Sequence, residues 1–223
     1  MGLYNQPTQT GELVAVILRS VLSLNIVRAV LCPVVSVAIF LSGDARAADP
    51  RLPATVKATD VPASYRIESN HYVTAREAAD VVAKLPNVLL IDVRTYAETL
   101  FNGIATPMHR HIPYVMLDVD HSYDAGNQRY KLEPNPDFVK AVDNLLAEHK
   151  LNRGATLILY CSVGERSARA ANLLGGSGFA NVYSMVDGFE GDATSKAGPG
   201  WKTAGLPWSH RMAPSQAYKS PSM

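Results

Sequence analysis

Two short, uninterrupted apolar runs stand out in the pattern of hydrophobic and polar positions. They cover residues 88–91 and 157–160, and polar residues follow each of them at once. Runs of this length are too short for a buried helix and are typical of strands buried on both faces of a sheet. Residues 181–186 are expected to form a further strand.

Helical patterns lie between these runs. Thr74 and Glu77 have the spacing of a capping box, and the apolar residues behind them recur on one helical face as far as Leu85. Pro86 is expected to end this helix. The alternation of helix and strand signals predicts an α/β domain with a central parallel sheet flanked by helices.

Two more helices are predicted farther along the chain. Residues 138–149 carry an apolar stripe at helical spacing, with Asn135 as the expected N-cap and Pro136 at the first helical position. Residues 166–174 are rich in alanine, which suits a helix lying close to a sheet, and this helix is expected to end at Gly175-Gly176.

The front of the chain has the plan of a secretory signal peptide. Residues 29–43 are uncharged, Arg28 lies just upstream, and an Ala-Arg-Ala sequence ends at Ala47. We therefore expect residues 1–47 to be removed and the protein to be periplasmic or otherwise exported. The apolar core is shorter than the roughly 20 residues that a membrane span needs. An uncleaved anchor is the alternative, and only in that case is a membrane a partner.

Composition fits one globular domain behind this leader. The chain has 223 residues, of which 47% are hydrophobic, and a formal net charge of +1. Because there is no basic excess, nucleic acid is not expected as a partner. Residues 48–68 contain three prolines and are expected to be a linker or N-terminal arm, with the domain at 69–208 and a loose tail at 209–223.

Candidate chemistry centres on Cys161, which directly follows the strand predicted at 157–160. Ligands bind at the carboxyl ends of strands in open α/β sheets, and a helix amino end favours an anion. Cys161 is therefore expected to be a reactive thiolate, with a small buried structural cysteine as the alternative. Cys32 lies in the predicted leader, so removal of the leader excludes an internal disulfide.

The loop after this cysteine resembles the active-site loop of the rhodanese (sulfurtransferase) family. Arg166 and Ser167 follow Cys161 after four intervening residues, with Gly164 in the middle. In phosphatases of the same fold the arginine comes one position later, so the count favours sulfur chemistry over a phosphatase or arsenate reductase. Asp-Val-Arg at 92–94, with Glu98 four residues on, resembles the second family signature.

This resemblance covers roughly residues 69–208 and implies one rhodanese-like domain. It implies an enzyme that moves a sulfane sulfur, without a cofactor, from a donor such as thiosulfate to a thiol or cyanide-like acceptor. Cys161 would carry the sulfur as a persulfide. The alternative is a sulfur carrier or interaction module that serves a protein acceptor. The loop residues expected to bind substrate and persulfide are Ser162, Val163, Gly164, Glu165, Arg166 and Ser167.

Charged residues near the loop are expected to have supporting roles. Asp92, Arg94 and Glu98 are interpreted as structural ion pairs beneath the loop, with Arg94 and Glu98 able to meet across a helical turn. The charges of Glu165 and Arg166 roughly cancel. We therefore expect poor use of the thiosulfate dianion, and Glu165→Lys to improve it.

Histidines raise the question of a metal. His109, His111 and His121 lie near Asp118 and Asp120, and both residue types are metal ligands. No tight set of four ligands can be recognised, so a solvated polar loop without metal is expected.

Overall fold

The computed structural model describes residue 52 and residues 55–191 and 198–221, which all belong to the compact unit Ala45–Met223. The predicted signal peptide at 1–47 lies outside the described residues, and so does most of the linker before residue 55. Among the described helices, none has the length and apolar character needed to cross a membrane.

The predicted central parallel sheet is confirmed. It has five strands in the order β1-β10-β9-β2-β4, and every neighbouring pair is parallel. In the middle of the sheet, Asp92 on β2 lies beside Tyr160 on β9, so both strands end at the same edge. The strands are β1 (Tyr72–Val73), β2 (Val88–Asp92), β4 (Arg110–His111), β9 (Thr156–Tyr160) and β10 (Asn181–Met185).

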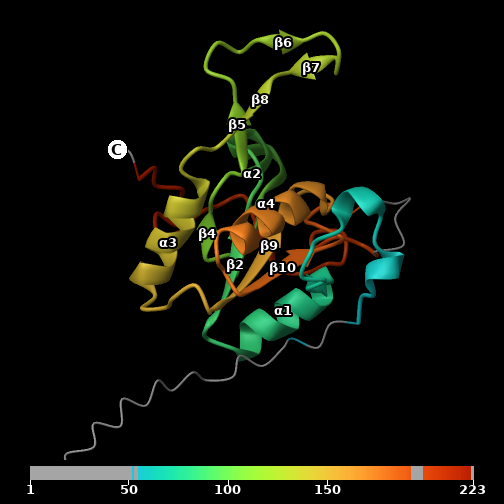
Figure 1. The fold of residues 1–223 in the computed structure, drawn as a ribbon, viewed down its shortest axis with the longest axis vertical. Helices are drawn as coiled ribbons and strands as arrows, with labels where there is room; N and C mark the ends of the chain where they lie inside the picture. Colours follow the sequence, from blue (N-terminus) through green and yellow to red (C-terminus); the bar gives the residue numbers. More distant parts are fainter. Residues whose placement is uncertain (1–51, 53–54, 192–197, 222–223) are drawn as a thin grey trace, which may run out of the picture. The chain divides into compact units, whose positions relative to one another are not determined.

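Alternating side chains of β2 and β9 supply two separate hydrophobic cores. Leu89 and Leu157 pack in one core with apolar residues of α3 and α4, whereas Leu90 and Ile158 pack in the other with residues of α1. This explains why both strands are continuous apolar runs. The helices, seen in Figure 1, are α1 (Ala75–Lys84), α2 (Tyr96–Asn102), α3 (Phe138–Glu148) and α4 (Glu165–Gly176), with 3-10 turns at Ala58–Asp60 and Ala63–Tyr65.

Two capping boxes fix helix starts at the same edge of the sheet. The Thr74 hydroxyl accepts the backbone N–H of Glu77 at 3.3 Å, and the Glu77 carboxylate accepts the N–H of Thr74 at 2.8 Å, as predicted for α1. Thr95 and Glu98 form a second box at the start of α2, which the sequence analysis did not identify.

The start of α3 differs from the prediction, whereas the end of α4 agrees with it. The helix α3 begins at Phe138, because the Asn135 side chain accepts the N–H of Asp137 at 3.0 Å and donates to the Pro113 carbonyl at 2.8 Å. Asn135 thus holds a turn before the helix. The helix α4 ends at Gly176, within the Gly175-Gly176 pair at which its end is expected.

Residues 115–134 form an arm that contains two antiparallel strand pairs. β5 pairs with β8, and β6 pairs with β7 at the end of this arm, which lies at the top of Figure 1. These strands have two or three residues each and no clear apolar alternation, so the sequence pattern does not reveal them. They are β5 (Val115–Leu117), β6 (Tyr123–Asp124), β7 (Arg129–Tyr130) and β8 (Leu132–Pro134).

The segment predicted as a loose tail is instead fixed to the domain. β11 (Trp208–Ser209) pairs with β3 (Ile104–Ala105), and the Gln216 carbonyl accepts the N–H of His111 at 2.8 Å. Tyr218 packs against the hydrophobic core formed with α3 and α4. Polar composition concealed this contact, because most of it consists of hydrogen bonds from backbone and polar side chains rather than apolar packing.

Candidate active site

Cys161 occupies the point that its sequence position predicts. It is the first residue beyond β9, and α4 begins four residues later at Glu165. The cysteine is a free thiol and only 1% exposed. A sulfur atom is therefore buried at the amino end of a helix, where unpaired N–H groups and the helix dipole favour negative charge.

Hydrogen-bonding groups surround the sulfur. The Gly164 N–H donates to Cys161 Sγ at 3.2 Å, and Ser167 Oγ lies 3.8 Å from the same atom. Ser167 Oγ donates to the Gly164 carbonyl at 2.9 Å and lies 3.0 Å from Ser184 Oγ. Ser167 thus faces the sulfur as expected. Ser184 was not identified from sequence because it lies within an otherwise apolar strand.

Two glycines allow the segment after β10 to lie directly on the loop. Gly164 has φ 106°, and a Cβ there would lie 2.4 Å from the Val186 carbonyl oxygen. Gly188 has φ 64°, and a Cβ there would lie 2.2 Å from the Ser162 carbonyl oxygen. Both positions require glycine, because the backbone conformation and the available space exclude a side chain.

Backbone hydrogen bonds hold this contact in place. The Phe189 N–H donates to the Cys161 carbonyl at 2.7 Å, and the Glu190 N–H donates to the Ser162 carbonyl at 2.9 Å. The Glu190 carboxylate also accepts hydrogen bonds from the Ser162 hydroxyl and the Asn102 amide. Glu190 and Asn102 were not identified from the sequence as neighbours of the loop, because they come from segments far from it along the chain.

Arg166 ties the loop to α2. Its guanidinium donates two hydrogen bonds of 2.6 Å to the Glu98 carboxylate. From the sequence, Arg94 is the expected partner of Glu98, but the partner is Arg166. Burial raises the pKa of Glu98, but hydrogen bonds and the charge of Arg166, together with hydrogen bonds from Thr95, outweigh it and lower the pKa to about 2. Glu98 therefore remains a carboxylate and holds Arg166 in position.

The expected ion pair beneath the loop is present between Asp92 and Arg94. Both side chains are fully buried, and their shortest contact is 2.6 Å. Arg94 also donates to the Gly103 carbonyl at 2.7 Å, and its guanidinium lies 4.1 Å from the centre of the Phe189 ring. Burial opposes the charged form of Arg94, but the Asp92 charge outweighs it and raises the Arg94 pKa. The pair connects β2, the C-cap of α2 at Gly103 and the segment after β10.

Glu165 does not form an ion pair with Arg166, the residue whose charge it is expected to cancel. Its carboxylate pairs with Arg169 one helical turn later at 2.5 Å, and its side chain is 41% exposed. The charge of Glu165 is therefore balanced by Arg169, and not by Arg166 as the expected charge balance of the loop assumed.

Comparison with known proteins now identifies the family. The model of the rhodanese-like domain matches residues 74–194, which is more than half of the chain. The chain belongs to the rhodanese-like family.

The similar proteins include an uncharacterized sequence relative and two proteins of solved structure. An uncharacterized protein of Rickettsia rickettsii, the "RP600 homolog", is 32% identical over 138 residues, which cover 61% of this chain and 94% of the relative. The crystal structure of Rv0390 from M. tuberculosis is 26% identical with a TM-score of 0.42, and covers 62% of this chain and 96% of that protein. The polysulfide-sulfur transferase homodimer of Wolinella succinogenes is 19% identical with a TM-score of 0.40, and covers 62% and 77%.

Histidines of this rhodanese-like domain are engaged in its framework. His109 Nδ1 accepts the Leu90 N–H at 3.0 Å, and His111 Nε2 lies 2.8 Å from the Arg94 carbonyl oxygen. Burial lowers the pKa of both histidines. Within the described part of the chain, no group of three or more His, Cys, Asp or Glu is placed to hold a metal.

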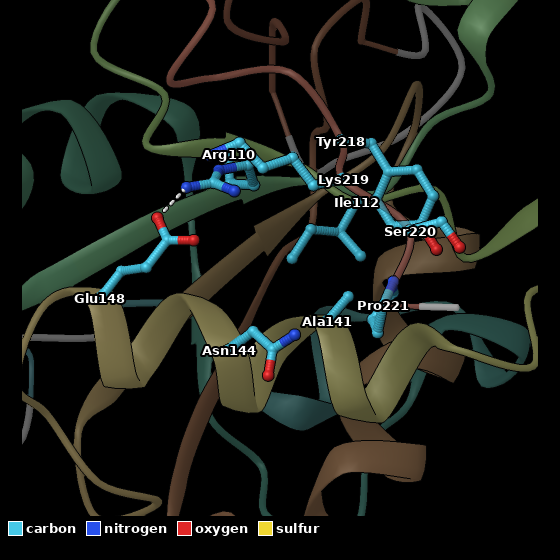
Figure 2. Close-up of a pocket in the computed structure, with 9 residues that line it drawn as sticks. All are labelled: Arg110, Ile112, Ala141, Asn144, Glu148, Tyr218, Lys219, Ser220 and Pro221. Carbon is cyan, nitrogen blue, oxygen red and sulfur yellow. Dashed lines mark hydrogen bonds and ion pairs between the residues drawn. The ribbon is translucent and has the colours of Figure 1, made fainter. Parts of the chain in front are cut away.

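A separate cavity of about 110 Å³ lies between β4, α3 and the C-terminal segment of the rhodanese-like domain. Figure 2 shows Arg110 and Glu148 paired on one side of it, at 2.5 Å, and Tyr218 on another. None of its lining residues belongs to the Cys161 loop. This cavity is therefore not the space in which the thiol would react.

Proposed function

We propose that the protein is a sulfurtransferase in which Cys161 carries a persulfide between a sulfur donor and a thiophilic acceptor. The observation that carries the proposal is the position of Cys161 Sγ, which lies at the amino end of α4 and accepts the Gly164 N–H at 3.2 Å. A hydrogen bond to sulfur and a helix amino end both stabilise a thiolate, which is the nucleophilic form.

Two nucleophilic steps make up the proposed reaction. The Cys161 thiolate attacks the outer sulfur of thiosulfate, the sulfur–sulfur bond breaks, and sulfite leaves with the electron pair. An acceptor such as cyanide then attacks the terminal sulfur of the persulfide, so that thiocyanate leaves and the thiolate returns. This covalent scheme predicts ping-pong kinetics.

Groups around the sulfur have distinct parts in this scheme. The Gly164 N–H donates to Sγ and is placed to stabilise a negative sulfur. The Ser167 hydroxyl lies 3.8 Å from Sγ and donates its hydrogen to the Gly164 carbonyl, so it holds the turn of the loop. Arg166 is held by Glu98 and braces the loop. No described histidine contacts Sγ, and a thiolate needs no general base.

A specific observation also favours a protein as the acceptor. Leu100 and Phe101 on α2 are 69% and 74% exposed, and the next residue, Asn102, binds Glu190 beside Ser162. Apolar side chains exposed this close to the loop are typical of a surface that contacts another protein. A sulfur carrier with little small-molecule turnover is therefore the second candidate.

Steady-state turnover tests the proposal. The purified protein is mixed with thiosulfate and cyanide, and thiocyanate is measured against Cys161→Ser as the matched control. We expect turnover only in the protein with Cys161. Persulfide formation without turnover would favour the carrier. Equal turnover in both proteins would show that another group is responsible.

A further inference from the structure

Basic side chains at the loop are already occupied by acidic partners. Arg166 pairs with Glu98 at 2.6 Å, and Arg169 pairs with Glu165 at 2.5 Å. Each of these pairs is neutral as a whole. Neither arginine therefore supplies an uncompensated positive charge for an anionic donor.

Glu190 differs from these acidic residues because its recorded partners are uncharged. Its two carboxylate oxygens accept hydrogen bonds from the Ser162 hydroxyl and the Asn102 amide. Over the described residues, no arginine, lysine or histidine lies within ion-pair distance of it. The negatively charged Glu190 carboxylate is thus hydrogen-bonded to Ser162, the residue that directly follows Cys161.

The position of Glu190 is fixed from the backbone as well. Its N–H donates to the Ser162 carbonyl at 2.9 Å, and its own carbonyl accepts the Thr203 hydroxyl at 2.7 Å. Lys202 is the basic residue next to Thr203, but its ammonium donates to the Asn102 carbonyl at 3.0 Å and lies 3.9 Å from the Trp208 ring centre. Its charge is directed at a carbonyl and an aromatic face.

We propose that Glu190 determines donor specificity by placing a negative charge beside Cys161, so that the protein discriminates against dianionic thiosulfate and favours organic persulfides of low charge. This inference rests on the proposed function. It transfers to Glu190 the charge effect that the sequence analysis had assigned to Glu165. The Ser162 hydroxyl fixes the direction of the carboxylate, and Asn102 fixes its other oxygen.

Both donors give the same enzyme intermediate. With thiosulfate, the thiolate takes the outer sulfur and sulfite leaves with two negative charges. With an organic persulfide RSSH, the thiolate takes the terminal SH and RS⁻ leaves, so the total charge is unchanged in each case. Only the first reaction brings a dianion next to Glu190, so only this reaction should respond strongly to the Glu190 charge.

The experiment measures the second-order rate of persulfide formation by intact mass, with thiosulfate and with the persulfide of an uncharged thiol. Glu190→Gln keeps the size of the side chain but removes the charge. Its amide oxygen can still accept from the Asn102 amide, and its NH2 can donate to the Ser162 hydroxyl oxygen. We expect it to raise the thiosulfate rate by roughly three- to tenfold at low salt, with a smaller gain at high salt. The organic persulfide rate should change by less than about twofold, because no dianion is involved.

Two controls separate charge from packing. Glu190→Asp keeps the charge and should retain the wild-type ratio of the two rates. Glu133→Gln removes an exposed carboxylate on β8, which is paired with Lys131 in the arm, and should leave both rates unchanged. Thermal unfolding of each variant verifies that it is folded.

The outcomes separate failure of the proposed sulfur transfer from failure of the role of Glu190. If the wild-type protein takes sulfur from neither donor, the proposed function fails, and the role of Glu190 fails with it. If sulfur is transferred but the ratio of the two rates is the same in Glu190→Gln and wild type, the proposed function stands and the role of Glu190 is overturned. A changed ratio in Glu190→Asp as well would attribute the effect to shape and also overturn it.

Discussion

Arg166 and Glu98 form a two-pronged ion pair, with both N–O distances at 2.6 Å, between the Cys161 loop and helix α2. The arginine that marks the loop in the sequence is therefore used to position the loop. Because Thr95 also caps α2 through Glu98, one carboxylate connects the helix start to the loop.

Glu98→Gln should weaken both connections. A neutral amide cannot accept two charge-assisted hydrogen bonds, and we expect a loss of about 2 kcal/mol in the free energy of unfolding at neutral pH. The pKa of Glu98 is lowered from 4.5 to about 2, so its stabilisation is present above pH 4.5 and is lost as pH falls toward 2. Urea unfolding should thus show the difference between the variant and wild type shrinking below pH 4.5. A constant difference would contradict this role.

Arg94→Ala should be more damaging than the loss of a surface pair. It leaves the Asp92 carboxylate buried without its partner, which typically costs about 3–5 kcal/mol. Arg169→Ala removes an exposed arginine of α4 and should cost less than about 0.5 kcal/mol. Chemical denaturation compares the two. Equal losses would show that the Asp92–Arg94 pair does not support the loop.

Asp187 should make stability depend on pH in the opposite direction to Glu98. It is 3% exposed, and burial raises its pKa from 3.8 to about 7, although the Ala75 N–H donates to both carboxylate oxygens. Between these values the folded protein holds a proton that the unfolded chain has released, so stability falls as pH rises from about 4 to 7. Asp187→Asn should remove up to about 4 kcal/mol of this pH dependence. An unchanged slope in thermal unfolding between pH 4.5 and 7.5 would contradict the assignment.

Gln216→Ala tests whether the C-terminal segment is part of the domain. The Gln216 side chain donates to the Met108 carbonyl at 2.6 Å and to the Thr106 carbonyl at 3.2 Å. Its loss should lower the free energy of unfolding by about 1–2 kcal/mol. Ser215→Ala, at an exposed neighbouring position, should have almost no effect. A variant as stable as this control would show that the segment contributes little.

The sequence predicts the three inner strands of the central sheet well because they are buried on both faces, but it does not reveal the two-residue edge strands β1 and β4. Residues 88–91 and 157–160 have no polar interruption, and each strand differs from its predicted range by one residue. The position of Cys161 follows from the same pattern, since it is the first residue after the second run. The local hydrophobic pattern is sufficient to predict both the inner strands and the position of the cysteine.

Contacts between distant segments could not be predicted in this way. Glu98 and Arg166 are 68 residues apart, and Asn102 and Glu190 are 88 apart. Spacing within a helix suggested that Glu98 would meet Arg94, but Arg94 is directed into the core by Asp92. The carboxylate that binds the Ser162 hydroxyl is thus identified only when the fold brings the segment after β10 onto the loop.

The central claim is that Cys161 carries sulfur, and intact mass spectrometry tests it most directly. The purified protein and Cys161→Ser are each incubated with thiosulfate and with an organic persulfide, desalted and weighed, and the modified peptide is then mapped. The account predicts the added mass of one sulfur atom on the peptide that contains Cys161, its removal by cyanide, and no addition to Cys161→Ser. Sulfur added equally to both proteins, or no addition from either donor, would contradict it.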